Sequence, residues 1–142
     1  MTHENKETVR RLYEDVFEGG VLDLADELVD AEARDHADSE DRRGPARVKE
    51  VATMLKAAFP NAHWEIQELV AEDETVVMHC VWSGTHEGNF MGIEPTGRTF
   101  ADVHHAYFFR LEDGKVTEYR AVRDDMSLMR QLGVIPSPGI CV

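Results

Sequence analysis

An acidic pair, Asp124-Asp125, stands between a strand-forming segment and a short helical pattern. A carboxylate at such a junction can move a proton if its surroundings desolvate it, because burial raises the pKa of an acid toward that of a useful base. Strict alternation along residues 116–124 predicts that Arg120 and Asp124 share one face and reach one pocket. The alternative interpretation is structural, with Asp124 or Asp125 capping the helix that follows.

Histidines are the second group that could do chemistry, since the chain contains 7 of them. His104 and His105 are adjacent in a predicted strand, so one of them faces each side of the sheet. An inward histidine near Asp124 would be a proton or hydrogen-bond donor, or simply a satisfied wall residue. The histidine spacings do not match a zinc site, and we expect no metal. The sequence also lacks a nucleophile elbow, a phosphate loop and a dinucleotide fingerprint, so we expect no cofactor.

Large apolar side chains provide the material for a pocket as well as for a core. Gly88 and Gly92 bracket Phe90-Met91, which indicates a loop that carries these two side chains at a pocket mouth. We expect most of the other aromatic residues to be core and a subset to line a pocket for a flat ligand. The predicted ligand-binding set is Tyr13, Phe59, Trp64, Trp82, His86, Phe90 and Met91.

The elements that must position these residues follow from hydrophobic periodicity. Helical spacing predicts helices over residues 4–18 and 22–29, a third from Pro45 to Phe59, and a short one over 126–132. Alternation predicts strands over 64–70, 75–85, 99–111 and 116–123, with a hairpin turn at 112–115. The polar run 30–43 predicts a loop or short strand. Helices in one block and strands in another indicate an α+β domain, with helices on one face of a curved, mostly antiparallel sheet.

The composition indicates one domain over residues 1–142, because 42% hydrophobic residues are enough for a single core. No apolar run approaches the roughly 18 residues that span a bilayer, and the N-terminus has no signal region, so we expect a cytoplasmic protein. A net charge of -13 argues against nucleic acid or an anionic membrane as partners. Cys80 lies in an apolar strand pattern and is predicted to be core, whereas Cys141 is expected to be exposed or packed on a partner.

A pattern that runs through nearly the whole chain resembles the SnoaL-like polyketide cyclases, within the wider group of cone-shaped α+β folds that includes ketosteroid isomerase. The residues that carry the resemblance are Asp35-His36, Gly44-Pro45, Phe59-Pro60, Gly84-Thr85-His86, Gly88, Phe90, Gly92, Pro95-Thr96-Gly97-Arg98, Arg110, Asp113-Gly114-Lys115, Glu118, Asp124 and Gln131-Leu132-Gly133.

The resemblance implies a bent sheet wrapped round an apolar cavity, in a homodimer or larger oligomer. It implies an intramolecular aldol cyclisation without metal or cofactor, in which an aspartate on the last strand takes a proton from an acidic carbon. Asp124 is the matching position, and His36, His105 and Arg120 are candidate wall residues by proximity and register. Many relatives carry Trp where this chain has Arg120, and an inward Arg there would stabilise an oxyanion or depress the pKa of Asp124.

Three functions therefore stand as hypotheses. The first is an enzyme that abstracts a proton next to a carbonyl, with Asp124 as base, to cyclise or isomerise a small apolar substrate. The second is a non-catalytic protein that sequesters a small apolar or aromatic molecule in the same cavity. The third is a cofactor-free hydrolase or dehydratase in which Asp124 and a histidine activate water.

The charge pattern makes a prediction about salt. The 28 acidic residues are dispersed along the chain, and Arg greatly outnumbers Lys, which suggests a protein adapted to high salt. Because salt screens the mutual repulsion of these acids, we expect the thermal unfolding midpoint to rise between low salt and molar potassium chloride. An unchanged unfolding midpoint would instead indicate a protein that is merely acidic and works at ordinary salt.

Overall fold

The computed structural model describes residues 2–136. Its helical segments are α1 (Thr2–Arg11), the π-helical η1 (Leu12–Glu18), the 3₁₀-helical η2 (Leu22–Leu24), α2 (Ala25–Leu28), α3 (Gly44–Ala58) and α4 (Asp125–Gln131). Its strands are β1 (Val29–Asp35), β2 (His63–Glu72), β3 (Thr75–Thr85), β4 (Thr99–Glu112) and β5 (Lys115–Arg123). The predicted α+β class is confirmed, and Cys141 lies outside the described residues.

The five strands of residues 2–136 form one curved, unclosed sheet in the order β1-β5-β4-β3-β2. Strands β2 to β5 pair antiparallel, and β1 pairs parallel to β5. The hairpin between β4 and β5 was predicted, and its turn residues Asp113 and Gly114 have φ values of 51 and 77, the geometry of a tight two-residue turn. The short-strand alternative for the polar run was the right one, since β1 lies at its start.

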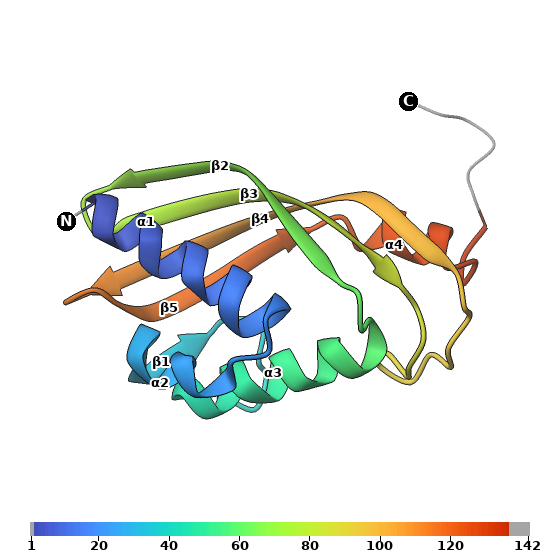
Figure 1. The fold of residues 1–142 in the computed structure, drawn as a ribbon, viewed down its shortest axis with the longest axis horizontal. Coiled ribbons are helices and arrows are strands. Elements are labelled where there is room, and N and C mark those ends of the chain that lie inside the picture. The colour runs from blue at the N-terminus through green and yellow to red at the C-terminus, as the bar shows by residue number, and fades with distance from the viewer. Residues whose placement is uncertain (1, 137–142) are drawn as a thin grey trace.

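The helices cover the concave face of the sheet (Figure 1). The segment formed by α1 and η1 crosses this face, and α3 lies on the same side of the sheet. Along β4, alternate side chains point into this concave face and are buried, and the core they form includes Tyr107 and Phe109. Tyr13 of η1 packs its ring against both, at centroid distances of 4.9 Å and 6.0 Å. Cys80 is fully buried in β3, as predicted.

A β-bulge interrupts β5 and decides which of its side chains face inward. Arg110 of β4 pairs with Glu118, but the next residue, Leu111, pairs with Val116, so Thr117 is an extra residue in β5. An extra residue reverses the alternation on its two sides. Val116 is buried in the core, yet beyond the bulge it is Tyr119 and the alternate residues after it that face the concave side.

The opposite face of the sheet is left open by the described helices. Val70, Phe108 and Val122 are exposed there, and Val77 joins the row because it pairs with both Val70 and Phe108. The homodimer expected from the sequence stays a prediction.

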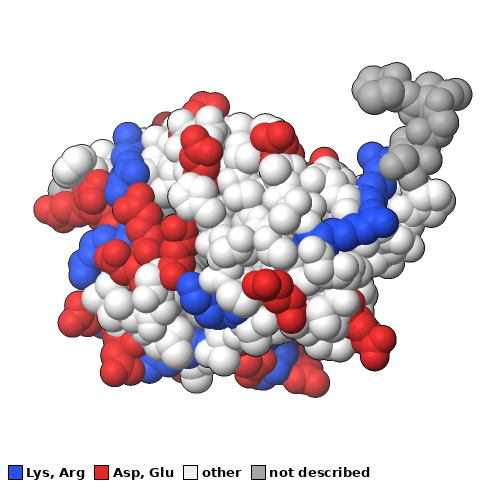
Figure 2. Space-filling model, turned by 45° about the vertical axis from the view of Figure 1, so that its right-hand side comes forward, with Lys and Arg blue, Asp and Glu red and all other residues white. Residues whose placement is uncertain are grey.

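Figure 2 shows another side of the molecule, where acidic side chains gather toward one end and a wide area carries no charged residue. Within residues 2–136, no helix has the length and apolarity to cross a membrane.

Two neighbouring phenylalanines test the assignment of faces. Phe109 is 1% exposed and Phe108 is 37% exposed, on opposite sides of β4. Phe109→Ala should lower the free energy of unfolding by about 3–5 kcal/mol, because it leaves a cavity in the aromatic core. Phe108→Ala should cost less than about 1 kcal/mol. Urea unfolding monitored by circular dichroism measures both, and equal losses would contradict the assignment.

Candidate active site

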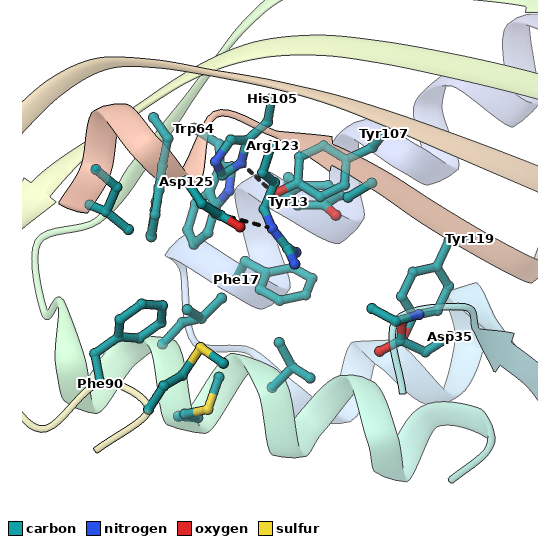
Figure 3. A pocket seen from close by; sticks show the side chains of 18 of the residues that line it. Tyr13, Phe17, Asp35, Trp64, Phe90, His105, Tyr107, Tyr119, Arg123 and Asp125 are labelled. Atoms are coloured by element: carbon teal, nitrogen blue, oxygen red, sulfur yellow. Dashed lines mark hydrogen bonds and ion pairs between the residues drawn. The ribbon is translucent and has the colours of Figure 1, made fainter. Parts of the chain in front are cut away.

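A cavity of about 390 Å³ opens between the concave face of the sheet, η1 and α3. Aromatic and aliphatic side chains make most of its wall (Figure 3). Five of the seven residues predicted from the sequence to bind a ligand line it, namely Tyr13, Trp64, Trp82, Phe90 and Met91. Met91 is 77% exposed, which fits the predicted place at the mouth.

The other two predicted ligand-binding residues, Phe59 and His86, do not line the cavity. Both are fully buried. Phe59 packs its ring against Trp82, Phe90 and Phe100 and supports the wall from behind. His86 holds the loop after β3, because its Nδ1 lies 3.1 Å from the hydroxyl and from the backbone N–H of Thr96. The sequence could not separate wall from support because both are apolar or aromatic.

His105 is a buried titratable group in the cavity wall, and it is 3% exposed. Its Nδ1 lies 2.8 Å from the hydroxyl of Tyr107, two residues along β4 on the same face. Burial, together with the positive charge of Arg123, lowers the pKa of His105 to about 4, so the imidazole is neutral near pH 7. Its Nε2 has no hydrogen-bond partner among the described residues. The cavity wall therefore contains a neutral imidazole with one free nitrogen.

Arg123 and Asp125 lie beside this imidazole (Figure 3). Arg123 is the last residue of β5, and Asp125 is the first residue of α4. The Arg123 Nε is 3.6 Å from the Asp125 Oδ1, and the two side chains are 41% and 64% exposed. This separation is longer than a charge-assisted hydrogen bond, so neither group is tightly held by the other. Both lie where the cavity meets solvent.

A second polar group lies at another part of the wall, near the end of β1. Asp35 accepts hydrogen bonds from the backbone N–H of Ala37 at 2.9 Å and from the Arg47 Nε at 3.0 Å. Tyr119 of β5 lies next to it (Figure 3). Burial raises the pKa of Tyr119, and the charge of Asp35 and a hydrogen bond to it raise it further. The parallel pairing of β1 with β5 brings these groups together, since Asp35 pairs with Tyr119.

The predicted catalytic residues Asp124, Arg120 and His36 lie outside the cavity wall, and only His105 of that set lines it. The prediction that Arg120 and Asp124 face a common pocket was wrong, because the bulge at Thr117 reverses the alternation. The capping alternative is confirmed for Asp124, whose Oδ1 accepts a hydrogen bond from the Ser127 backbone N–H at 3.1 Å.

His36 is exposed in the turn after β1, where its Nε2 lies 3.7 Å from the Oε2 of Glu118. Its neighbours Asp35 and Ala37 line the cavity instead. The sequence therefore located the right segment but the wrong residue.

Sequence reasoning missed several polar wall residues: Asp35, Arg47, Tyr107, Tyr119, Arg123 and Asp125. Two features of the sequence could have identified two of these residues, Tyr107 and Asp125. Alternation along β4 places Tyr107 on the same face as His105, and Asp125 is the other member of the acidic pair. Among residues 2–136, no cluster of three or more His, Cys, Asp or Glu side chains could hold a metal ion.

The burial of His105 makes a prediction about pH. We expect the His105 imidazole to titrate with a pKa of about 4 instead of the ordinary 6.5. An NMR titration of the imidazole would measure this pKa. The unfolded chain takes up this proton at higher pH than the folded protein does. The free energy of unfolding should therefore fall by about 1–3 kcal/mol as the pH drops from 6.5 toward 4.

Two variants separate this effect from other acid-sensitive groups. His105→Gln should make the free energy of unfolding depend less on pH between 6.5 and 4. Arg123→Gln should raise the pKa of His105, because a nearby positive charge is removed. A His105 that titrates near 6.5 in the unmodified protein would contradict the buried, neutral assignment.

Comparison with known proteins places these features in a family. A family model for SnoaL-like polyketide cyclases matches residues 7–132. The chain is 32% identical over 130 residues to the aklanonic acid methyl ester cyclase DnrD of Streptomyces peucetius, with 88% of each chain covered.

Solved structures agree with this match. IdmH, a proposed polyketide cyclase from Streptomyces antibioticus, is 30% identical with a TM-score of 0.76 over 91% of this chain and 98% of that one. A proposed SnoaL-like polyketide cyclase from Jannaschia sp. CCS1 is 25% identical with a TM-score of 0.85 over 96% of each chain. By sequence, fold and cavity, this chain belongs to the SnoaL-like polyketide cyclase family.

Proposed function

We propose that this protein is a cyclase-type enzyme that removes a proton next to a carbonyl of a small aromatic or apolar substrate. The observation that carries the proposal is the neutral His105 in the wall of an aromatic cavity. Its Nε2 is without a partner among the described residues, and a carboxylate and a guanidinium lie beside it. A buried nitrogen of this kind is costly unless a ligand satisfies it.

His105 serves as the hydrogen-bond donor to the substrate oxygen. When the Tyr107 hydroxyl donates to Nδ1, the imidazole proton resides on Nε2, which has no partner among the described residues. Because its pKa is about 4, the imidazole stays neutral and stabilises the developing enolate by hydrogen bonding. The positive charge of Arg123 acts on the same oxygen.

Asp125 serves as the base in place of Asp124. Among residues 2–136 it is one of two carboxylates in the cavity wall, and Asp35, the other, is engaged with Arg47 and Ala37. The Asp125 carboxylate takes the proton from the acidic carbon, and the C–H electron pair becomes the double bond of the enolate. The enolate carbon then forms a C–C bond to a second carbonyl of the same molecule, and the resulting alkoxide recovers the proton from Asp125.

The relatives and the cavity support a proposal for the substrate class. DnrD is named for aklanonic acid methyl ester, and a 390 Å³ cavity with aromatic walls suits a flat molecule. We therefore assign to this chain the intramolecular aldol cyclisation of an aromatic polyketide ester. The net charge of -13 disfavours nucleic acid and anionic membranes as alternative partners.

Deuterium exchange at carbon tests the mechanism. Ethyl benzoylacetate incubated with the protein in heavy water should take up deuterium at its acidic carbon faster than it does in buffer alone. Asp125→Asn should slow the catalysed uptake about 100-fold or more, because the base is removed. NMR follows the uptake directly.

Asp124→Asn is the matched control. Asn caps a helix as well as Asp does, so α4 and the fold should persist and uptake should stay within about two-fold. Uptake lost in Asp124→Asn but kept in Asp125→Asn would restore the original assignment of the base. Binding without any uptake would favour the sequestering protein, and ester hydrolysis without carbon exchange would favour the hydrolase.

A further inference from the structure

We propose that Asp35 forms a second binding site in this cavity, which accepts a hydrogen bond from a hydroxyl group of the ligand. The inference deepens the proposed function and rests on it for the position of the reacting carbonyl. It assigns the substrate class more narrowly, to aromatic ketones that carry a phenolic hydroxyl far from that carbonyl.

Asp35 is held rigidly and faces the cavity although its side chain is only 8% exposed. A carboxylate has about four acceptor positions on its two oxygens. Within residues 2–136, two donors bond to Asp35, the Ala37 N–H and the Arg47 Nε–H, and the Tyr119 side chain lies next to it. Acceptor capacity is left on Asp35 for a ligand, in a wall that is otherwise largely apolar.

The charges round Asp35 favour a neutral hydroxyl over an ion. A ligand carboxylate would be repelled by Asp35 itself, and Arg47 offers it little, because Arg47 already pairs with Asp35, Asp38 and Glu50. A ligand ammonium would meet the guanidinium of Arg47 3.0 Å from the same carboxylate. A hydroxyl donates one hydrogen bond to the carboxylate and avoids both repulsions.

The two polar groups lie on different sides of the cavity. Figure 3 shows Asp35 and Tyr119 on one side and His105, Arg123 and Asp125 on the other, with Phe17 between them. A flat ligand that spans the cavity therefore meets a donor at one end and an acceptor at the other. The matching molecule has a carbonyl at one end of its ring system and a hydroxyl at the opposite end.

Direct binding of paired probes tests the site. The probes are a hydroxyacetonaphthone with acetyl and hydroxyl groups on opposite rings and its methyl ether, which has the same shape but cannot donate. The chain has 2 tryptophans, Trp64 and Trp82, and both line the cavity, so quenching of their fluorescence reports binding. We expect the hydroxyl probe to bind about 10-fold more tightly than its ether, as for one hydrogen bond to a charged group.

Variants locate the acceptor. Asp35→Asn should bring the two affinities to within about three-fold, whereas Asp30→Asn, on the same strand but outside the cavity wall, should keep the preference. Tyr119→Phe leaves the two hydrogen bonds to Asp35 in place and should keep the preference for the hydroxyl probe. Preference lost in Tyr119→Phe but kept in Asp35→Asn would overturn the assignment to Asp35.

A spectroscopic readout covers the case in which Asp35→Asn does not fold. The absorption band of the bound naphthol should shift to longer wavelength in the unmodified protein, because its hydroxyl donates to a carboxylate. Equal affinity for the two probes without this shift would overturn the proposal, while leaving carbon exchange by Asp125 untouched. Failure of both probes to bind would also overturn it. Loss of exchange in Asp35→Asn with an unchanged hydroxyl preference would instead make Asp35 the proton acceptor.

Discussion

The single extra residue in β5 controls the composition of the cavity wall. With Thr117 as a bulge, Val116 completes the core on one side, and Tyr119, Ala121 and Arg123 face the cavity on the other. Without the bulge, the same strand would turn Glu118, Arg120 and Val122 inward. Bulges recur next to active sites because they re-aim side chains at small cost to the rest of the sheet. The positions of the tyrosine and the arginine relative to His105 both depend on this irregularity.

Polar groups in an aromatic cavity need partners, and the structure supplies them unevenly. Asp35 accepts hydrogen bonds from a backbone N–H and a guanidinium and keeps acceptor capacity on its two oxygens. Among the described residues, His105 has a partner on the side of Tyr107, and its Nε2 has none. Because both groups belong to a rigid sheet or are anchored to it, they can hold their orientation before a ligand arrives. Preorganised donors of this kind stabilise a developing charge without reorganisation.

The surface and the interior follow different electrostatic rules. The surface carries an excess of acidic residues spread over many elements, which disfavours polyanionic partners. Within the part of the chain that the structure describes, the cavity wall has two carboxylates and two guanidinium groups, Asp35 with Arg47 and Asp125 with Arg123. A nearly neutral cavity suits an uncharged aromatic ligand, and the remaining selectivity then comes from where individual donors and acceptors stand.

The sequence by itself determined the fold class, the strands β3 and β4 almost to the residue, the hairpin turn, and that His104 and His105 face opposite sides of the sheet. These features follow from local periodicity and turn chemistry, which act over a few neighbouring residues. Only the tertiary structure decided that β1 pairs parallel to β5, that Thr117 is a bulge, and that Asp125 instead of Asp124 reaches the cavity. The parallel pairing depends on contacts between segments some 84 residues apart, such as Asp35 and Tyr119. The bulge depends on how β5 pairs with β4, and no pattern within a single strand encodes such a register.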